Sequence, residues 1–160
     1  MVADPLRELD CPAHADGVSA VIIAAGDAAR RLVARPAWIR GIDHRSDLQN
    51  LGNRSMTSLP SAALAAHHAG AFDDRIDVAQ LHAPYSHQEL LLTSALGLGE
   101  ATSVNPSGGA LCANPIMSAG LARLAEAAAR IHDGTADRAV GHASSGPWLQ
   151  QNLVCVLEGE

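Results

Sequence analysis

Residues 104–120 read Val-Asn-Pro-Ser-Gly-Gly-Ala-Leu-Cys-Ala-Asn-Pro-Ile-Met-Ser-Ala-Gly, and this stretch decides how the rest of the chain is interpreted. A short β-prone lead ends at Pro106, and the pair Gly108-Gly109 then allows a tight turn whose backbone can lie close to a ligand. A strongly apolar helical pattern follows at 121–131. A strand, a glycine turn and a helix start in this order can aim backbone N–H groups at a ligand, but they also fit an ordinary connection. Both interpretations stay open at this point.

Composition limits the classes of protein and partner. The chain has 160 residues, 48% apolar and only 2% aromatic, which predicts one domain with a core of Ala, Leu, Val and Ile. A formal charge of −6 and a pI near 5.7 argue against nucleic acid or an anionic membrane as partner. We recognise no signal peptide, and no apolar run reaches the ~20 residues of a membrane span. Three widely spaced cysteines predict a reduced, cytoplasmic protein rather than a disulfide framework.

The order of apolar and polar segments predicts alternating strands and helices. The strands are expected at 18–25, 38–43, 77–82, 138–142 and 152–157, and the helices at 28–34, 62–72, 86–96 and 118–131. Val18–Ala25 is β-branched and continuously apolar, which is typical of a strand buried on both faces. Pro60 and Ser86 are expected to begin helices, with Ser86 as a cap, and 43–59 to form a long loop. The pattern favours an α/β fold with a mixed five-stranded sheet, mostly parallel with an antiparallel last strand, and helices packed on it.

Polar residues gather where predicted strands end. The clusters are His82-Ala-Pro-Tyr85, Asn105 to Asn114, and His142-Ala-Ser-Ser-Gly146. In open α/β sheets, chemistry gathers where strands finish and loops begin, and a sheet can bring ends from distant parts of the chain together. We therefore expect a functional site at this edge of the sheet.

Some of these residues resemble a known superfamily. The run Asp77-Val-Ala-Gln-Leu-His-Ala-Pro-Tyr-Ser-His-Gln-Glu-Leu90, followed by Asn105-Pro-Ser-Gly-Gly-Ala110, resembles the C-terminal half of the thiolase superfamily. The most similar branch is the sterol-carrier-type thiolases and lipid-transfer thiolase-like proteins, with a His-Asp-Cys-Phe or His-Glu-Ala-Phe motif, Asn-Glu-Leu on a helix, Asn-Pro-Ser-Gly-Gly and a Gly-His-Pro loop. The opening run from Asp4 to Val21 is similar to the first strand of that half. The resemblance implies a thiolase C-terminal-like domain over 1–160, with the N-terminal, nucleophile-bearing half absent.

The first motif of this resemblance assigns roles at the end of one strand. His82 matches the histidine that helps to form an oxyanion hole for the thioester carbonyl, although a histidine that only caps the strand end also fits. Tyr85 stands where the motif has Phe, which implies a packing role. Gln88 and Glu89 match the Asn-Glu pair of the following helix, which implies that they hold the loop.

The resemblance also implies a coenzyme A thioester as substrate and no metal. Ser107, Gly108 and Gly109 match the turn beneath the pantetheine arm of acyl-CoA. A metal site built from His82 and His87 would lack further ligands. Cys112 lies near a helix start, where a thiol pKa can be lowered, but a small buried residue is the preferred interpretation.

Three positions depart from the family pattern. Asn114 stands where Gly-His-Pro has the histidine that activates the nucleophile, and an amide can donate to an oxyanion but cannot act as a general base. Pro84 replaces the motif cysteine that serves as acid or base. His142 lies near the place of another catalytic Cys or His, so it is a candidate acid or base, or a structural histidine.

Two functions from different classes follow, and whether the chain is an enzyme stays open. The first is a subunit of a thiolase-like acyl-CoA acyltransferase, with His82, Asn114 and His142 facing a cysteine from a separate N-terminal half, or a related retro-aldolase acting on steroid side chains. The second is a non-catalytic scaffold for acyl-CoA binding or lipid transfer. The resemblance implies an oligomer with an N-terminal thiolase half or another thiolase-fold subunit, and a possible zinc-ribbon and OB-fold partner. Helix 118–131 is the expected face toward the missing half.

Overall fold

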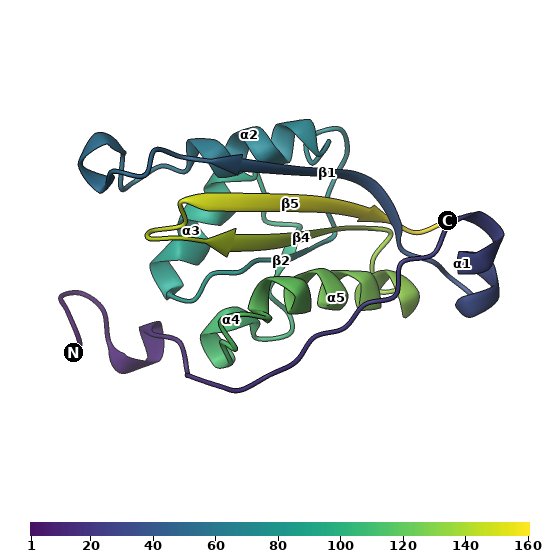
Figure 1. Cartoon of the computed structure of the whole chain (residues 1–160), viewed down its shortest axis with the longest axis horizontal. Coiled ribbons are helices and arrows are strands. Elements are labelled where there is room, and N and C mark those ends of the chain that lie inside the picture. Colours follow the sequence, from purple (N-terminus) through teal and green to yellow (C-terminus); the bar gives the residue numbers. More distant parts are fainter.

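A computed structural model describes residues 1–160 and shows a mixed five-stranded sheet with helices packed on both faces (Figure 1). The strands are β1 Trp38–Ser46, β2 Val78–Gln80, β3 Ser103–Val104, β4 Arg138–Ser145 and β5 Gln151–Glu158. The α-helices are α1 Gly26–Leu32, α2 Pro60–His68, α3 Ser86–Ala95, α4 Gly109–Cys112 and α5 Ala119–His132, and the 3-10 turns are η1 Glu8–Asp10 and η2 Leu51–Asn53.

The sheet order is β1-β5-β4-β2-β3. β5 runs antiparallel to both of its neighbours, β1 and β4, whereas β2 is parallel to β4 and β3. The first four strands therefore share one direction and the last strand opposes them. This confirms the predicted α/β class, the mixed sheet and its antiparallel last strand.

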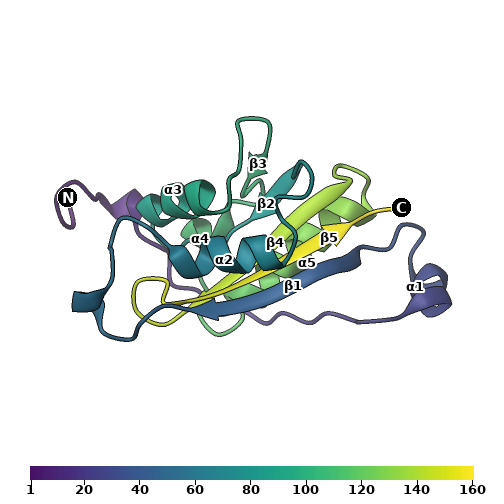
Figure 2. The same ribbon diagram turned by 90° about the horizontal axis from the view of Figure 1, so that it is seen from above.

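Helices cover the two faces of the sheet unequally (Figure 2). α2 and α3 lie on one face, over a core that includes Leu81, Leu92 and Val140, and α5 lies on the other, where Ala127 and Ile131 are buried. The chain has almost no aromatic residues to fill its core, and the helices instead pack very closely against the sheet at glycine positions. A Cβ at Gly41 would overlap the carbonyl oxygen of Ala69, and one at Gly141 would come within 2.9 Å of the Leu124 backbone.

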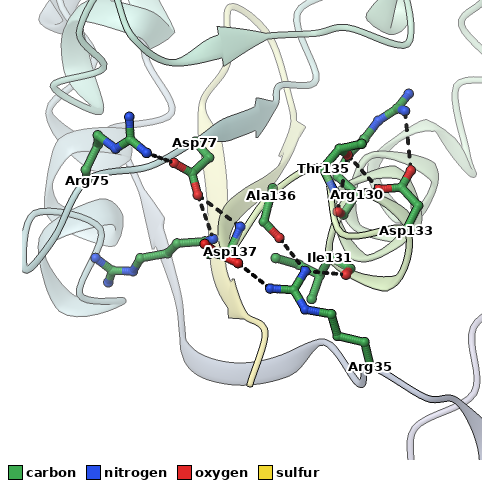
Figure 3. Close-up of polar contacts among 10 residues, drawn as sticks. Arg35, Arg75, Asp77, Arg130, Ile131, Asp133, Thr135, Ala136 and Asp137 are labelled. Carbon is green, nitrogen blue, oxygen red and sulfur yellow. Dashed lines mark hydrogen bonds and ion pairs between the residues drawn. The ribbon is translucent and has the colours of Figure 1, made fainter.

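A polar network fixes the end of the sheet where β2 and β4 begin (Figure 3). Asp77 Oδ2 accepts hydrogen bonds from the backbone N–H groups of Asp137 and Arg138, both at 3.0 Å. Arg35 pairs with Asp137 and donates to the carbonyl oxygens of Ile131 and Ala136 at 2.7 and 2.8 Å. The network sets the register of β2 against β4, and therefore determines which residues meet at the opposite ends of these strands.

The prediction of a buried strand at Val18–Ala25 is wrong. The segment is extended but belongs to no sheet, and β1 is the first strand of the fold. Val18, Ile22 and Ile23 are 96%, 87% and 80% exposed. A continuously apolar segment is buried only where other strands pair with it and helices cover it. No strand of this chain pairs with residues 18–25, and their large side chains stay exposed.

The predicted helices are present, but some of their ends differ: α1 covers 26–32 rather than 28–34, and α2 ends at His68 rather than at Phe72. α2 begins at Pro60 as predicted, but Tyr85 rather than Ser86 is the N-cap of α3, and the Tyr85 N–H donates to Gln88 Oε1 at 3.2 Å. Ser86 Oγ instead donates to Asp10 Oδ1 at 2.8 Å. The expected loop at 43–59 is shorter, because β1 continues to Ser46. None of the helices combines the length and the hydropathy that crossing a membrane requires.

Candidate active site

His82 lies just beyond β2, at the end of the sheet opposite to the Asp77 network. β2 pairs with β4 up to Gln80 and Gly141, so a residue two positions further on meets the Ser144 end of β4. The Nδ1 atom of His82 lies 3.0 Å from Ser144 Oγ and 3.3 Å from Ser144 N, and its Nε2 atom lies 3.2 Å from Asn114 Oδ1. His82 is only 7% exposed, which leaves the ring largely shielded from water. Both of its ring nitrogens nevertheless have hydrogen-bond partners within the protein.

The environment keeps the His82 ring neutral. Burial lowers the pKa of His82, hydrogen bonds to Asn114 and Ser144 oppose this shift, and the charge of Arg123 adds to it. In the tautomer protonated at Nε2, the Nε2–H donates to Asn114 Oδ1 and the Nδ1 atom accepts from the Ser144 N–H; in the tautomer protonated at Nδ1, the Nδ1–H donates to the Ser144 carbonyl oxygen, 3.1 Å away. A neutral, pre-oriented N–H donor in a site with little water is suited to stabilising a developing oxyanion.

Asn114 is held by the N-terminal segment. Its backbone N–H donates to Ala13 O at 3.0 Å, and Ala13 N–H donates to Leu111 O at 3.3 Å. Residues 14–17 and 114–117 then form the two walls of an open groove of about 560 Å³. Asn114 lines this groove and also contacts His82, so a ligand that reaches Asn114 would lie close to the His82–Asn114 pair.

The glycine turn is tied to the same strand end through Asn105. Asn105 Oδ1 accepts from the Leu81 N–H at 2.7 Å, and its Nδ2 donates to Glu89 Oε2 at 2.5 Å, so Glu89 holds the turn as expected. Gly108 and Gly109 have φ values of +91° and +63°, and a Cβ at Gly109 would come within 2.9 Å of Asn105 Cγ. The two glycines are therefore required by the backbone and by internal packing.

Ser107 and Arg123 lie beneath this turn. Ser107 Oγ donates to Gln80 Oε1 at 2.8 Å and accepts from Arg123 Nη1 at 3.0 Å. Burial lowers the pKa of Arg123. The hydrogen bond that its guanidinium group donates to Ser107 goes to a neutral hydroxyl group and not to a carboxylate. Cys112 lies beside Gly108 and is exposed, so the expectation that it is buried is wrong.

His142 is brought near the site but is sealed inside the protein. It lies within β4 and is 0% exposed, and its Nε2 atom lies 2.9 Å from Asn152 Oδ1. Asn152 Nδ2 donates to Ser61 Oγ at 2.8 Å, and Ser61 Oγ donates to Asp47 Oδ2 at 2.7 Å. Burial lowers the pKa of His142 to about 4, and its Nδ1 atom has no hydrogen-bond partner. His142 forms no hydrogen bond with His82 or Asn114, so only two of the three predicted catalytic residues are in contact.

Comparisons with known proteins bear on the family and the fold of the chain. No family model matches the chain. The acetyl-CoA acetyltransferase of Methanothermobacter thermautotrophicus is 29% identical over 169 residues, which cover 91% of this chain and 44% of that protein. The protein of the same name from Methanocaldococcus jannaschii is 31% identical over 144 residues, which cover 74% of this chain and 37% of that protein. The crystal structure of human mitochondrial 3-ketoacyl-CoA thiolase matches 78% of this chain and 30% of its own, with a TM-score of 0.59 at 20% identity.

The chain is a C-terminal-like unit of the thiolase superfamily. It spans less than half of the length of the relatives that it matches. In this thiolase-like unit, no three His, Cys, Asp or Glu side chains are arranged to hold a metal ion. His87 stacks on Trp148 with ring centroids 5.1 Å apart.

Sequence reasoning missed several residues that shape the candidate site. Ser144 orients the His82 ring, Arg123 supports Ser107, and Asn152 holds His142. Ser144 belongs to one of the polar clusters noted in the sequence, so its position offered a signal. Arg123 is flanked by apolar residues in the sequence, and a polar residue within an apolar helix pattern is the signal that identifies it, whereas Asn152 follows Gln150 and Gln151 and carries no such signal.

Proposed function

We propose that the chain forms the oxyanion-hole side of a thiolase-type acyl-CoA acyltransferase site, whose nucleophilic cysteine comes from a separate N-terminal half. The reaction would be thiolysis of a 3-oxoacyl-CoA by coenzyme A, or the reverse condensation. The observation that carries this proposal is the contact of His82 Nε2 with Asn114 Oδ1 at 3.2 Å, next to the turn at Gly108 and Gly109. The acetyltransferase names of the two archaeal relatives support it.

The chemistry of the two side chains suits this task. In our proposal the thioester oxygen takes over the hydrogen bond that His82 Nε2–H now gives to Asn114, and the Asn114 amide N–H becomes the second donor. Burial lowers the pKa of His82, so the ring is present as a neutral donor. The groove of about 560 Å³ that Asn114 lines would admit the acyl-CoA arm.

The proposal assigns proton transfer from the cysteine to a group outside this pair. Asn114 does not titrate, and burial lowers the pKa of His142 to about 4 inside a closed environment. Consequently we expect no thiolysis of acetoacetyl-CoA by this chain alone. A separate half must contribute the cysteine and the group that deprotonates it.

Reconstitution tests the proposal. The chain is co-expressed with the part of the M. thermautotrophicus acetyl-CoA acetyltransferase that lies outside the region of similarity, and acetoacetyl-CoA thiolysis is followed by absorbance. His82→Ala and Asn114→Ala should each lower kcat/KM by ~10²–10³, the usual cost of losing one oxyanion donor. The exposed His67 provides the matched variant, since His67→Ala should leave the rate unchanged. An active complex that tolerates His82→Ala would refute the oxyanion role.

A second function, acyl-CoA binding or lipid transfer without catalysis, is favoured by one observation. The His82–Asn114 pair is poorly suited to act as a base, because Asn114 does not titrate and burial lowers the pKa of His82. On this alternative, the purified chain binds acetoacetyl-CoA in a calorimeter, and the reconstituted complex binds it without turnover.

A further inference from the structure

One segment of the chain has the composition of a protein interior and the exposure of a surface. Residues 18–25, here called the apolar segment, read Val-Ser-Ala-Val-Ile-Ile-Ala-Ala. Along an extended chain, Val18 and Ile22 point to one side and Val21 and Ile23 to the other. All four are exposed, Val21 by 45% and the others by 80% or more. Both sides of the apolar segment therefore carry large aliphatic side chains that contact water.

The backbone of the apolar segment is equally unsatisfied. No N–H or C=O group of residues 18–24 forms a hydrogen bond within the chain. The segment is fixed only near its ends: Ser19 Oγ donates to Ser118 O at 3.2 Å, Ser118 Oγ donates to Gly17 O at 3.1 Å, and α1 begins after Ala25. In both ribbon views it runs as a long thread past α5 to α1 (Figures 1 and 2).

We propose that the apolar segment is a β-strand that adds to the edge of a sheet in a second polypeptide, the N-terminal half of the assembly. This inference rests on the proposed function for the identity of the partner, and on the apolar segment for the mode of binding. Pairing would satisfy the free N–H and C=O groups, and a sheet would bury the aliphatic side chains. The fold leaves the segment extended and tethered at both ends, so little order has to be gained on binding.

The two-sided apolar character identifies the kind of sheet. A strand with large aliphatic residues on both sides needs a sheet that is covered by helices on both faces. The free edge of β1 in a second copy of this chain does not meet this condition. α2 covers the face of β1 at Gly41, whereas Ile42 on the other face is 54% exposed. A strand added there would keep either Val18 and Ile22 or Val21 and Ile23 in water.

The position of the apolar segment links it to the site. Gly17 immediately precedes it, and residues 14–17 form one wall of the groove that Asn114 lines. A polypeptide that takes up the apolar segment is therefore held next to this groove. Docking by the strand would thus bring the partner's cysteine to the side of the site that carries His82 and Asn114.

Co-expression followed by hydrogen–deuterium exchange tests the inference. The full chain is co-expressed with the M. thermautotrophicus portion defined above, and amide exchange at residues 18–24 is compared in the complex and in the chain alone. We expect fast exchange in the chain alone and protection of at least about 100-fold in the complex, as in a paired strand. Because the apolar segment makes so few contacts, its variants should fold normally.

Variants separate strand pairing from other contacts. Ile22→Asp should weaken the complex by about 100-fold or more, since it would bury a carboxylate. Val21→Pro, which removes one N–H without adding charge, should weaken it by about tenfold or more. Leu48→Asp is the matched control, because Leu48 is also 63% exposed but lies outside the apolar segment, and it should have no effect.

Each remaining outcome overturns the inference. These outcomes are no complex after co-expression, a complex without protection at 18–24, and protection that arises in a homodimer of this chain alone. Thiolysis is measured separately. A complex with a protected apolar segment but no turnover would refute the catalytic proposal and leave the strand inference standing. An active complex with fast exchange at 18–24 would refute the strand inference and leave the catalytic proposal standing.

Discussion

His142 should make the protein sensitive to acid, and the size of the effect follows from its burial. The ring is 0% exposed, and burial lowers its pKa from 6.5 to about 4. Because the folded-state pKa lies below the unfolded value, the unfolded chain takes up a proton first as the pH falls. Stability is therefore complete above pH 6.5 and is lost as the pH falls towards about 4. The gap corresponds to about 3 kcal/mol, since one pKa unit is worth about 1.4 kcal/mol.

Urea unfolding followed by circular dichroism at several pH values measures this loss. Carboxylates also titrate in this range, so the informative quantity is the difference between wild type and His142→Gln. The variant should lose about 3 kcal/mol less between pH 6.5 and pH 4 than the wild type. His67→Gln, at an exposed histidine, should keep the wild-type pH dependence. If His142→Gln and wild type lose stability in parallel, burial of a neutral His142 is not the source of acid sensitivity.

Three further predictions concern stability and thiol reactivity. Asn152→Ala should lower the free energy of unfolding in urea by about 3 kcal/mol or more, because it removes the hydrogen-bond partner of buried polar groups. Asn50→Ala is the control: Asn50 caps an exposed turn, and its loss should cost less than about 1 kcal/mol. Gly109→Ala should cost at least about 1–2 kcal/mol in thermal unfolding, because φ is +63° and the added Cβ meets Asn105; an unchanged melting temperature would contradict the turn geometry. Iodoacetamide should label the exposed Cys112 in the folded protein but not Cys155, whose pKa burial raises to about 11, and labelling of Cys155 without denaturant would contradict its burial.

The sheet and most helices were predictable because their signals are local. The strands predicted at 138–142 and 152–157 contain apolar, partly β-branched residues, and the structure extends them to β4 and β5. Gly108-Gly109 marked a turn where both residues indeed have positive φ. Such patterns depend on backbone sterics and on burial within this chain, which the sequence encodes directly.

The error at Val18–Ala25 has the opposite origin. Its pattern correctly indicates a segment suited to burial on both sides, but burial is a property of the surroundings, and no other strand of this chain pairs with it. Periodicity cannot say which polypeptide supplies the neighbouring strand. The same reasoning explains Cys112, whose apolar character suggested burial while the turn at Gly108 places it at the surface.

Part of the site was beyond reach for a related reason. His82 and Asn114 were recognised by their motif positions, and the structure brings them within hydrogen-bond distance. The series Asp47, Ser61, Asn152 and His142 joins four distant segments by hydrogen bonds, and no local pattern encodes such pairing. The contact between His142 and Asn152 depends on the register of β4 against β5, whereas Ser61 and Asp47 come from α2 and from the segment after β1.

The distribution of polar groups explains why a second polypeptide is needed for catalysis in the proposed assembly. The chain's two histidines near the site are both kept neutral, His82 as a donor and His142 inside a closed network, because burial disfavours their charged forms. Neutral donors stabilise an oxyanion but do not generate a thiolate, which requires a proton acceptor near the cysteine. A surface that supplied both functions would need a second titratable group with an accessible lone pair next to the desolvated donor. In the proposed assembly, dividing the two tasks between chains would remove this conflict, and the strand pairing proposed for the apolar segment would supply the precise docking that it requires.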